Sequence, residues 1–256
     1  MQVIHIVMHA VLKQAVKEGI LGLNPADAVE RPKVEVAEWK ILTEEQAQHL
    51  ITATTGTRYG TLIYFALVTG VREGELLGLK WSDVDWTKGQ LHVQRQLQVM
   101  KVDGSVLVPL KIKAGRRHIK LGSGTLDRLA LHRKHQEREK QARGARWEEN
   151  DLIFPNTIGK PISSRNMYDD YKRLLSENGL PDINFHALRH TSLSFLLDMG
   201  TPVNTIQHRA GHLKASVTTD MYGHSLGHSE DELRAGSKNY LCLLQSNCSQ
   251  NKAFGN

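Results

Sequence analysis

Cysteine is scarce in this 256-residue sequence, with Cys242 and Cys248 lying close together near the C-terminus. Two thiols cannot form a disulfide framework or supply the four ligands of a structural zinc site, and they are compatible with a reducing compartment. Long apolar runs are also missing, because the longest, Thr61 to Val71, is well short of the ~20 residues of a membrane-spanning helix. The first twelve residues lack the basic start and apolar run of a secretory signal. We therefore expect a cytoplasmic protein.

The charge balance is basic, with 33 Lys and Arg against 27 Asp and Glu, a net charge of +6 and a pI near 9.3. This excess favours a polyanionic partner such as nucleic acid without establishing one. The hydrophobic fraction of 40% and the charged fraction of 23% are typical of folded globular proteins. The length predicts one large domain, or one domain with a fragment of another.

Helical periodicity dominates both ends of the chain. Residues 9–30 predict a helix, a break at Gly, Asn and Pro, and a short second helix, and residues 33–42 predict a linker. A larger unit starts at Thr43, where Thr43 and Gln46 fit a capping box. Two helices with a sharp elbow at residues 69–71 follow, and the charged stretch of residues 132–150 predicts a solvated helix face. Further helices are expected over 163–177, 185–199, 202–211 and 214–222.

Alternation replaces this periodicity between Gln90 and Leu121. Turn residues at Asp103-Gly104 and at Ala114-Gly115 divide the stretch into three short strands, which predict one small antiparallel sheet. The fold class is therefore mainly α (α+β), a helical domain with a small three-stranded antiparallel sheet.

Three segments carry side chains that could perform chemistry. Arg72 opens a helix, where a guanidinium beside backbone amides can bind phosphate, although a lone arginine is more often a surface residue paired with an acid such as Glu75. His186, Arg189 and His190 share one side of a helix, so we expect them to face a polar cleft or water. The third segment holds His212 and, ten residues later, Tyr222, which taken alone would be an ordinary packing residue.

A metal site is the alternative for the histidines, since His at i and i+4 can share one zinc ion. Against it, the His186–His190 stretch lacks the Glu of a zincin helix and carries Arg189, whose charge would repel a cation. Arg209 between His208 and His212 raises the same objection. We therefore expect no metal and no cofactor.

Taken in order, these residues resemble the tyrosine recombinase (phage integrase) family. Arg72 in TGVREGELL is similar to the family's first catalytic arginine, and Lys111 in LKIKAGRRHIKL to its hairpin lysine, with Lys113 as the alternative. The remaining matches are the His-x-x-Arg box, the His/Trp position and the nucleophile, at His186, Arg189, His212 and Tyr222. The resemblance implies a remnant of the core-binding domain at 1–32, the linker at 33–42 and a catalytic domain at 43–226. The tail at 227–256 matches no motif of the family, and it could contact a neighbouring subunit or pack back onto its own core.

The resemblance further implies a site-specific DNA recombinase or integrase of a phage or other mobile element. Tyr222 would form a 3′-phosphotyrosine with double-stranded DNA, without metal or ATP, in a homotetramer that accessory DNA-bending proteins could assist and that would be nucleoid-associated when bound. Other basic residues would contact backbone phosphates, among them Lys80, Lys88, Arg95, Lys101, Arg116, Arg117 and Lys120. Two alternatives remain: a catalytically silent, truncated DNA-binding remnant, and a monomeric nicking and closing enzyme like a type IB topoisomerase. The target sequence and the direction of recombination cannot be derived.

Overall fold

The computed structural model describes residues 2–30, 40–100, 104–110 and 115–211. The chain divides into two compact units at the boundary between residues 39 and 40. Among the helices in these described ranges, none has the length and apolarity that a membrane crossing requires.

The first unit holds α1 (Gln2–Lys17) and the short 3₁₀ helix η1 (Pro25–Ala28). The predicted helix is confirmed, although it begins at Gln2 and not at residue 9. Asn24 joins the two helices, because its side chain accepts from the Ala26 N–H and donates to the His9 carbonyl at 3.3 Å. Apolar side chains on α1 stay exposed, namely Ile4, Ile6, Val7, Met8 and Val11.

The second unit opens with α2 (Glu44–Ala53), whose capping box is confirmed by reciprocal hydrogen bonds between Thr43 and Gln46. Leu42 already belongs to this unit: it is buried, and its N–H donates to Thr191 Oγ1 at 3.0 Å. Residues 33–39 of the predicted linker lie outside the described ranges, and the bounds of the linker stay a prediction.

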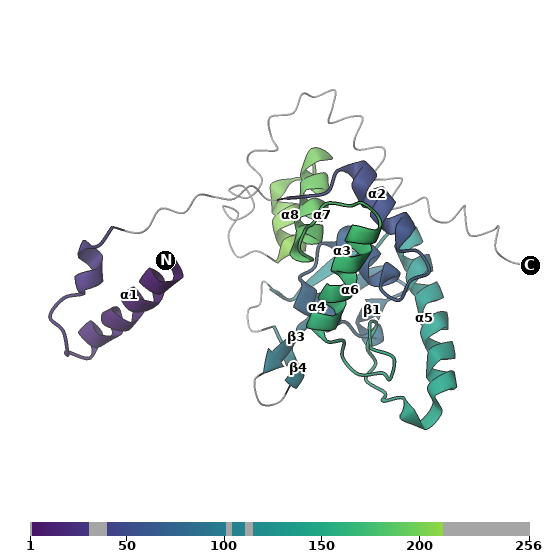
Figure 1. Ribbon diagram of the computed structural model, residues 1–256, viewed down its shortest axis with the longest axis horizontal. Helices are drawn as coiled ribbons and strands as arrows, with labels where there is room; N and C mark the ends of the chain where they lie inside the picture. The colour runs from purple at the N-terminus through teal and green to yellow at the C-terminus, as the bar shows by residue number, and fades with distance from the viewer. Residues whose placement is uncertain (1, 31–39, 101–103, 111–114, 212–256) are drawn as a thin grey trace, which may run out of the picture. The chain divides into compact units, whose positions relative to one another are not determined.

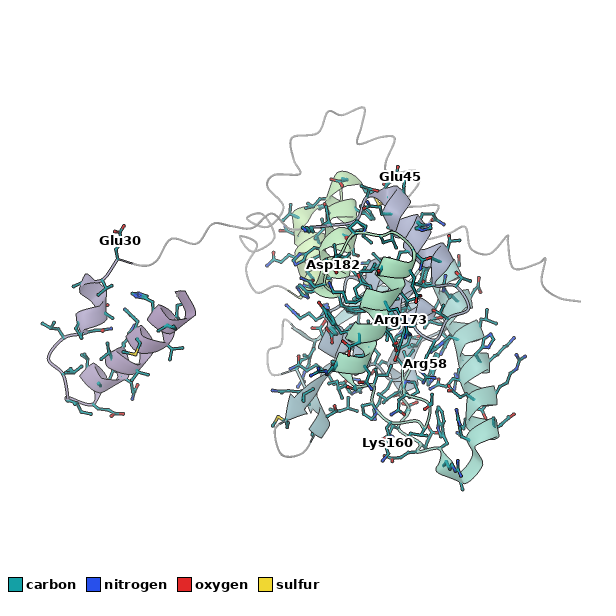
Figure 2. The ribbon with its side chains drawn as sticks, in the orientation of Figure 1. Glu30, Glu45, Arg58, Lys160, Arg173 and Asp182 are labelled. Carbon is teal, nitrogen blue, oxygen red and sulfur yellow. The ribbon has the colours of Figure 1, made fainter. Side chains whose placement is uncertain are left out.

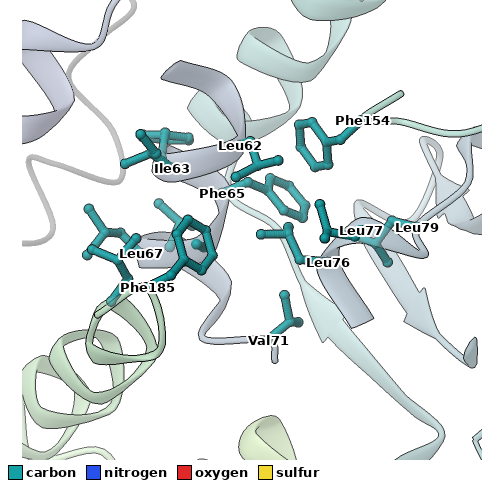
Figure 3. Close-up of a cluster of buried hydrophobic side chains, with 14 of the residues drawn as sticks. Leu62, Ile63, Phe65, Leu67, Val71, Leu76, Leu77, Leu79, Phe154 and Phe185 are labelled. Carbon is teal, nitrogen blue, oxygen red and sulfur yellow. The ribbon is translucent and has the colours of Figure 1, made fainter. Parts of the chain in front are cut away.

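Helix α3 (Gly60–Thr69) forms the centre of the core, and all its residues except Thr61 are buried. Figure 3 shows Phe65 beside Phe154, with their ring centroids 6.0 Å apart, and Phe185 beside Leu67. The expected elbow is confirmed: α3 ends at Thr69 with Gly70 as its C-cap residue, and α4 (Glu73–Leu77) begins after Arg72.

The strands differ from the prediction of a single sheet. A three-stranded antiparallel sheet contains β1 (Val84–Asp85), β2 (Gln90–Val93) and β5 (Arg117–Lys120), and β3 (Arg95–Met100) pairs separately with β4 (Gly104–Pro109). The expected first strand breaks at Gln94, whose side chain donates to Asp83 and whose carbonyl accepts from the Leu110 N–H. Beyond the break, β3 lies against α4, where a Cβ at Gly78 would be 3.0 Å from the Leu97 nitrogen.

The remaining helices surround this core (Figure 1). They are α5 (Ser123–Arg143), α6 (Ser164–Glu177), α7 (His186–Asp198) and α8 (Val203–Ala210), with the short 3₁₀ helices η2 (Trp81–Asp83) and η4 (Gly144–Arg146). The solvated face of α5 is confirmed, since only Thr125 and Leu129 of this helix are buried. Charged side chains such as Arg173 and Asp182 lie on the outside (Figure 2). The mainly helical fold with a small antiparallel sheet is thereby confirmed, and the helix expected at 214–222 lies outside the described residues.

Candidate active site

The turn between α3 and α4 places Arg72 at the start of α4. Gly70 adopts the left-handed conformation, with φ of 63°, which glycine reaches without a Cβ clash and which lets the chain reverse direction. A Cβ at Gly70 would lie 3.1 Å from Ser192 Oγ on α7, so the turn is also closely packed against that helix. Arg72 is the N-cap residue of α4, and 38% of its side chain is exposed. Its guanidinium can therefore meet an anion from solvent.

Glu75 holds Arg72 in place. The Arg72 backbone N–H donates to Glu75 Oε2 at 3.0 Å and its Nη1 donates to Oε1 at 2.9 Å, so the pairing suggested by the sequence is present. The Glu75 carboxylate is fully buried and also accepts two bonds from Arg117, at 2.8 and 3.2 Å. Burial alone would raise the pKa of Glu75, but the hydrogen bonds and charges of Arg117 and Arg72 outweigh it and hold that pKa below its ordinary value. Glu75 is thus an ionised carboxylate shared by two guanidinium groups.

The C-terminal end of α8 is the second anchor of the site. Three successive carbonyl groups there each accept a hydrogen bond from a different arginine. The pairs are Arg117 Nε to the Arg209 carbonyl at 2.7 Å, Arg189 Nη2 to the Ala210 carbonyl at 2.7 Å and Arg72 Nη2 to the Gly211 carbonyl at 3.0 Å. The last carbonyls of a helix lack intrahelical donors and lie at the negative end of the helix dipole, so cations are favourable partners for them.

Helix α7 contributes Arg189, and here the expectation that all three polar residues face a cleft or water was wrong. Arg189 and His190 are 3% and 2% exposed, whereas His186 keeps part of its surface exposed to solvent. Arg189 Nη1 donates to the Gly70 carbonyl at 2.5 Å, in addition to its bond with α8. Carbonyl groups at the ends of two other helices therefore provide the polar partners that let this guanidinium be buried.

His186 lies beside the arginines and packs edge-on against His190, with ring centroids 4.8 Å apart. Partial burial lowers the pKa of His186, and the positive charges of Arg189 and Arg72 lower it further. Its imidazole is therefore neutral at pH 7 and able to accept a proton.

Four residues singled out from the sequence, Lys111, Lys113, His212 and Tyr222, lie outside the described ranges. Their neighbours in the chain are described. A hydrogen bond links the two sides of residues 111–114, because Arg116 Nε donates to the Leu110 carbonyl at 3.3 Å. His212 directly follows Gly211 in the sequence, whose carbonyl accepts from Arg72.

Arg117 is the site residue that sequence reasoning assigned wrongly. It was expected to contact DNA phosphate, but its side chain is fully buried against Glu75. The strand pattern carried a clue: Arg117 and Ile119 share the buried face of β5, while His118 and Lys120 are exposed. An arginine in phase with core residues of a strand needs a buried anion or carbonyl as its partner.

A basic cavity of about 280 Å³ is lined by the residue that precedes η2, by residues of the β3–β4 hairpin and by Arg116. Its walls include Lys80, Arg95 and Arg116. Arg95 is paired with the buried Asp83 carboxylate, whereas Lys80 has no carboxylate within ion-pair distance among the described residues. In the same described ranges, no group of three or more His, Cys, Asp or Glu side chains is placed to hold a metal ion.

Comparison with known sequences gives the following relatives. Residues 40–228 match the family described as the phage integrase family. A tyrosine recombinase XerC-like protein of Caldanaerobacter subterraneus subsp. tengcongensis is 34% identical in an alignment of 228 residues, gaps included, that covers 82% of this chain and 58% of that protein. The ICEBs1 integrase of Bacillus subtilis is 28% identical over 225 residues, 86% of this chain and 60% of that protein. The chain thus spans about three-fifths of the length of these curated relatives.

Solved structures share the fold. The Tn1549 transposon integrase in complex with a circular intermediate DNA superposes with a TM-score of 0.73 at 20% identity, over 91% of this chain and 76% of that one. A lambda integrase dimer bound to a COC′ core site gives a TM-score of 0.57 at 22% identity, over 89% of this chain and 60% of that one.

Proposed function

Because the chain belongs to the phage integrase family, we propose that it acts as a site-specific recombinase of a mobile element, cleaving and rejoining DNA through a phosphotyrosine. The observation that carries the proposal is the convergence of Arg72 and Arg189 on adjacent carbonyls at the end of α8, with His186 beside them. Two anchored guanidinium groups next to a proton acceptor fit the needs of phosphoryl transfer.

The proposed role of Arg72 and Arg189 is to bind the scissile phosphate. Cleavage develops negative charge on the non-bridging oxygens, and cations fixed beforehand at that point lower the barrier most. Both terminal nitrogens of each guanidinium already donate to acceptors of the protein: those of Arg72 to Glu75 and the Gly211 carbonyl, and those of Arg189 to the Gly70 and Ala210 carbonyls. These bonds fix the plane of each guanidinium before the phosphate binds. His212, the residue after the anchored Gly211, would donate a further hydrogen bond to the phosphate.

Tyr222 is the proposed nucleophile. Its phenolic oxygen attacks phosphorus, the bond to the 5′ oxygen breaks, and a 3′-phosphotyrosine and a free 5′-hydroxyl result. The phenol proton passes to His186, while Lys111, or Lys113 in its place, donates a proton to the leaving oxygen. Tyr64 and Tyr171 are buried in the core, where burial raises the pKa of each phenol, so neither fits this role.

Rejoining is the reverse reaction with another 5′-hydroxyl. The energy of the broken bond is kept in the phosphotyrosine, so the proposed cycle needs no ATP, and the two arginines supply the charge that a metal ion provides in other phosphoryl transfer enzymes. Exchange between two duplexes requires several subunits. We infer a homotetramer on DNA that accessory DNA-bending proteins assist and that acts in the cytoplasm on nucleoid DNA.

Double-stranded DNA is the proposed substrate. The net charge of +6 and the basic cavity lined by Lys80, Arg95 and Arg116 support it, because such side chains bind backbone phosphates irrespective of sequence. We further infer that residues 43–226 form the catalytic domain, that residues 1–32 belong to a core-binding domain and that the tail 227–256 contacts a neighbouring subunit.

The silent DNA-binding remnant is not favoured. A chain without catalytic function has no need to keep Arg72, Glu75, His186 and Arg189 together. In the described residues, Arg72 and Glu75 are hydrogen-bonded to each other, Arg72 and Arg189 both bind the end of α8, and His186 lies beside them.

A covalent trapping assay tests the proposal. The full chain is incubated without metal or ATP with nicked duplexes carrying the end sequences of the element that encodes it, and the products are separated on a denaturing gel. We expect a slowly migrating protein–DNA adduct. Tyr222→Phe should abolish the adduct, whereas Tyr168→Phe, the same change at a partly exposed tyrosine of α6, should leave it intact.

The outcomes separate the candidate functions. An adduct lost only in Tyr222→Phe, followed by strand exchange between paired sites, supports a recombinase. Relaxation of supercoiled DNA without paired sites would indicate a topoisomerase-like enzyme. Retained DNA binding with no adduct would refute the enzyme and leave a DNA-binding remnant.

A further inference from the structure

Arg117, like Glu75, is a fully enclosed charge at the site. It lies on β5, its side chain has no exposed surface, and its guanidinium donates to three different parts of the chain. These bonds run to the Glu75 carboxylate, to the Arg209 carbonyl at 2.7 Å and to the Gly115 carbonyl at 3.0 Å. A buried guanidinium persists only where partners of this kind surround it.

The first connection leads to Arg72. Each oxygen of Glu75 accepts one bond from Arg72 and one from Arg117, so the carboxylate is fixed between the two arginines. Arg72 is partly exposed, while Arg117 occupies the buried side of the same carboxylate. Arg117 therefore determines how Glu75 is oriented, and Glu75 in turn orients Arg72.

The second connection leads to α8. Arg117 binds the Arg209 carbonyl, the first of the three carbonyls that accept from arginines. A Cβ on Gly211 would lie 2.9 Å from Arg117 Nη1 and 3.4 Å from Arg72 Nη1, so the end of α8 lies directly against both guanidinium groups. The Arg117 side chain thus connects strand β5 to Glu75 on α4 and to the end of α8, the two places where Arg72 is bound.

From these contacts we propose that Arg117 is a positioning residue of the cleavage reaction, which fixes Arg72 through Glu75 and through the end of α8 without touching DNA. The proposal rests on the recombinase function proposed above. It assigns Arg117 a role different from that of the basic residues which bind phosphate. Displacing a reacting group by about 1 Å can reduce a rate by roughly 100-fold, so replacing the Arg117 guanidinium should measurably lower the rate of DNA cleavage.

The test compares Arg117→Lys with Arg58→Lys in the full chain. Arg58 also bridges a carboxylate and a carbonyl, donating to Glu139 and to the Pro155 carbonyl, and lies outside the site. We expect Arg117→Lys to cleave about 10- to 100-fold more slowly in the trapping assay. DNA affinity and its dependence on salt should stay unchanged, because Arg117 contacts no phosphate. Arg58→Lys should cleave at the wild-type rate.

A substrate with a methylphosphonate at the scissile position separates positioning from a merely structural effect. The methyl group replaces a non-bridging oxygen and removes the charge that Arg72 would neutralise. The fold-loss of Arg72→Lys should therefore shrink on this substrate, and the fold-loss of Arg117→Lys should shrink with it. A loss of equal size on both substrates would indicate a general structural defect and overturn the proposal.

The remaining outcomes are also decisive. Wild-type cleavage by a folded Arg117→Lys protein would overturn the proposal, and so would a weaker salt dependence of DNA binding, which would place Arg117 on a phosphate. If Arg117→Lys does not fold, Arg117→Gln is measured in the same way, and failure of both to fold would make Arg117 a structural residue only. If the wild-type chain forms no adduct, the recombinase function itself fails, an outcome distinct from all of these.

Discussion

Replacing Gly211 by alanine tests how tightly the arginines enclose the end of α8. Gly211 has φ of 65°, so alanine there costs roughly 1–2 kcal/mol in backbone strain. The new Cβ would also lie 2.9 Å from Arg117 Nη1 and 3.2 Å from its Cζ. This guanidinium cannot move aside without breaking its bonds to Glu75, Arg209 and Gly115. Overpacking of this kind adds about 1–3 kcal/mol.

Gly200→Ala is the matched control. Gly200 has φ of 69°, but a Cβ there would meet nothing within 4 Å, so only the backbone strain applies. Effects on the unfolded chain are the same for both variants and cancel in the comparison. Gly211→Ala should therefore lower the free energy of unfolding by about 1–3 kcal/mol more than Gly200→Ala does.

Urea unfolding measures this difference through the fluorescence of Trp81, Trp86 and Trp147, which all lie in the second unit. The midpoint and the slope are fitted for each variant, since a changed slope would mean a changed denatured state. Equal losses in the two variants would refute the claim that the guanidinium groups confine Gly211. A loss larger in Gly200→Ala would have the same consequence.

Three further predictions concern charges at the site. Glu75→Gln leaves the buried Arg117 charge without a carboxylate, and urea unfolding at pH 7 should show a loss of about 3–5 kcal/mol. Folding lowers the pKa of Glu75, so its ionisation stabilises the folded protein above its ordinary pKa near 4.5, and this stabilisation disappears as the pH falls through the folded value. The free energy of unfolding of Glu75→Gln should therefore vary less with pH below 4.5 than that of the wild type. The cleavage rate should remain constant as the pH falls from 8 to about 6.5 and decline only below it, because the pKa of His186 is lowered; a decline already complete at pH 6.5 would exclude His186 as the proton acceptor. Lys80→Ala should reduce the slope of log affinity against log salt by about 1, whereas Lys160→Ala, which removes a lysine paired with Glu148, should not change it.

Local rules predicted most of the helices. Thr43 with Gln46, Gly70 and Gly211 are capping and turn positions whose physics is contained in a few neighbouring residues, and each occurs where the sequence indicated. The strands were predicted less well, because the break at Gln94 depends on Asp83 and Leu110, which are distant from it in sequence. Alternation alone cannot show which strand pairs with which.

The candidate site was likewise predictable only in part from the sequence. Arg72, His186 and Arg189 could be proposed from their spacing and from family resemblance, and the structure brings them to one place. The partners that allow Arg189 and Arg117 to be buried could not be foreseen, because they are carbonyl groups of residues 70, 115, 209 and 210 that come together only in the folded chain. A backbone carbonyl has no signature in the sequence.

The three bonded carbonyls at the end of α8 make the length of that helix critical. Each residue of an α-helix turns the chain by about 100° and advances it by about 1.5 Å. Deleting or inserting one residue between Pro202 and Ala210 would swing all three carbonyls away from their arginines together, and would redirect the chain that leads on to His212. A change of length after Gly211 would leave every one of those bonds in place. Insertions and deletions within α8 should therefore disturb the arginine–carbonyl bonds, whereas those downstream of Gly211 should affect catalysis through the spacing of His212 and Tyr222 instead.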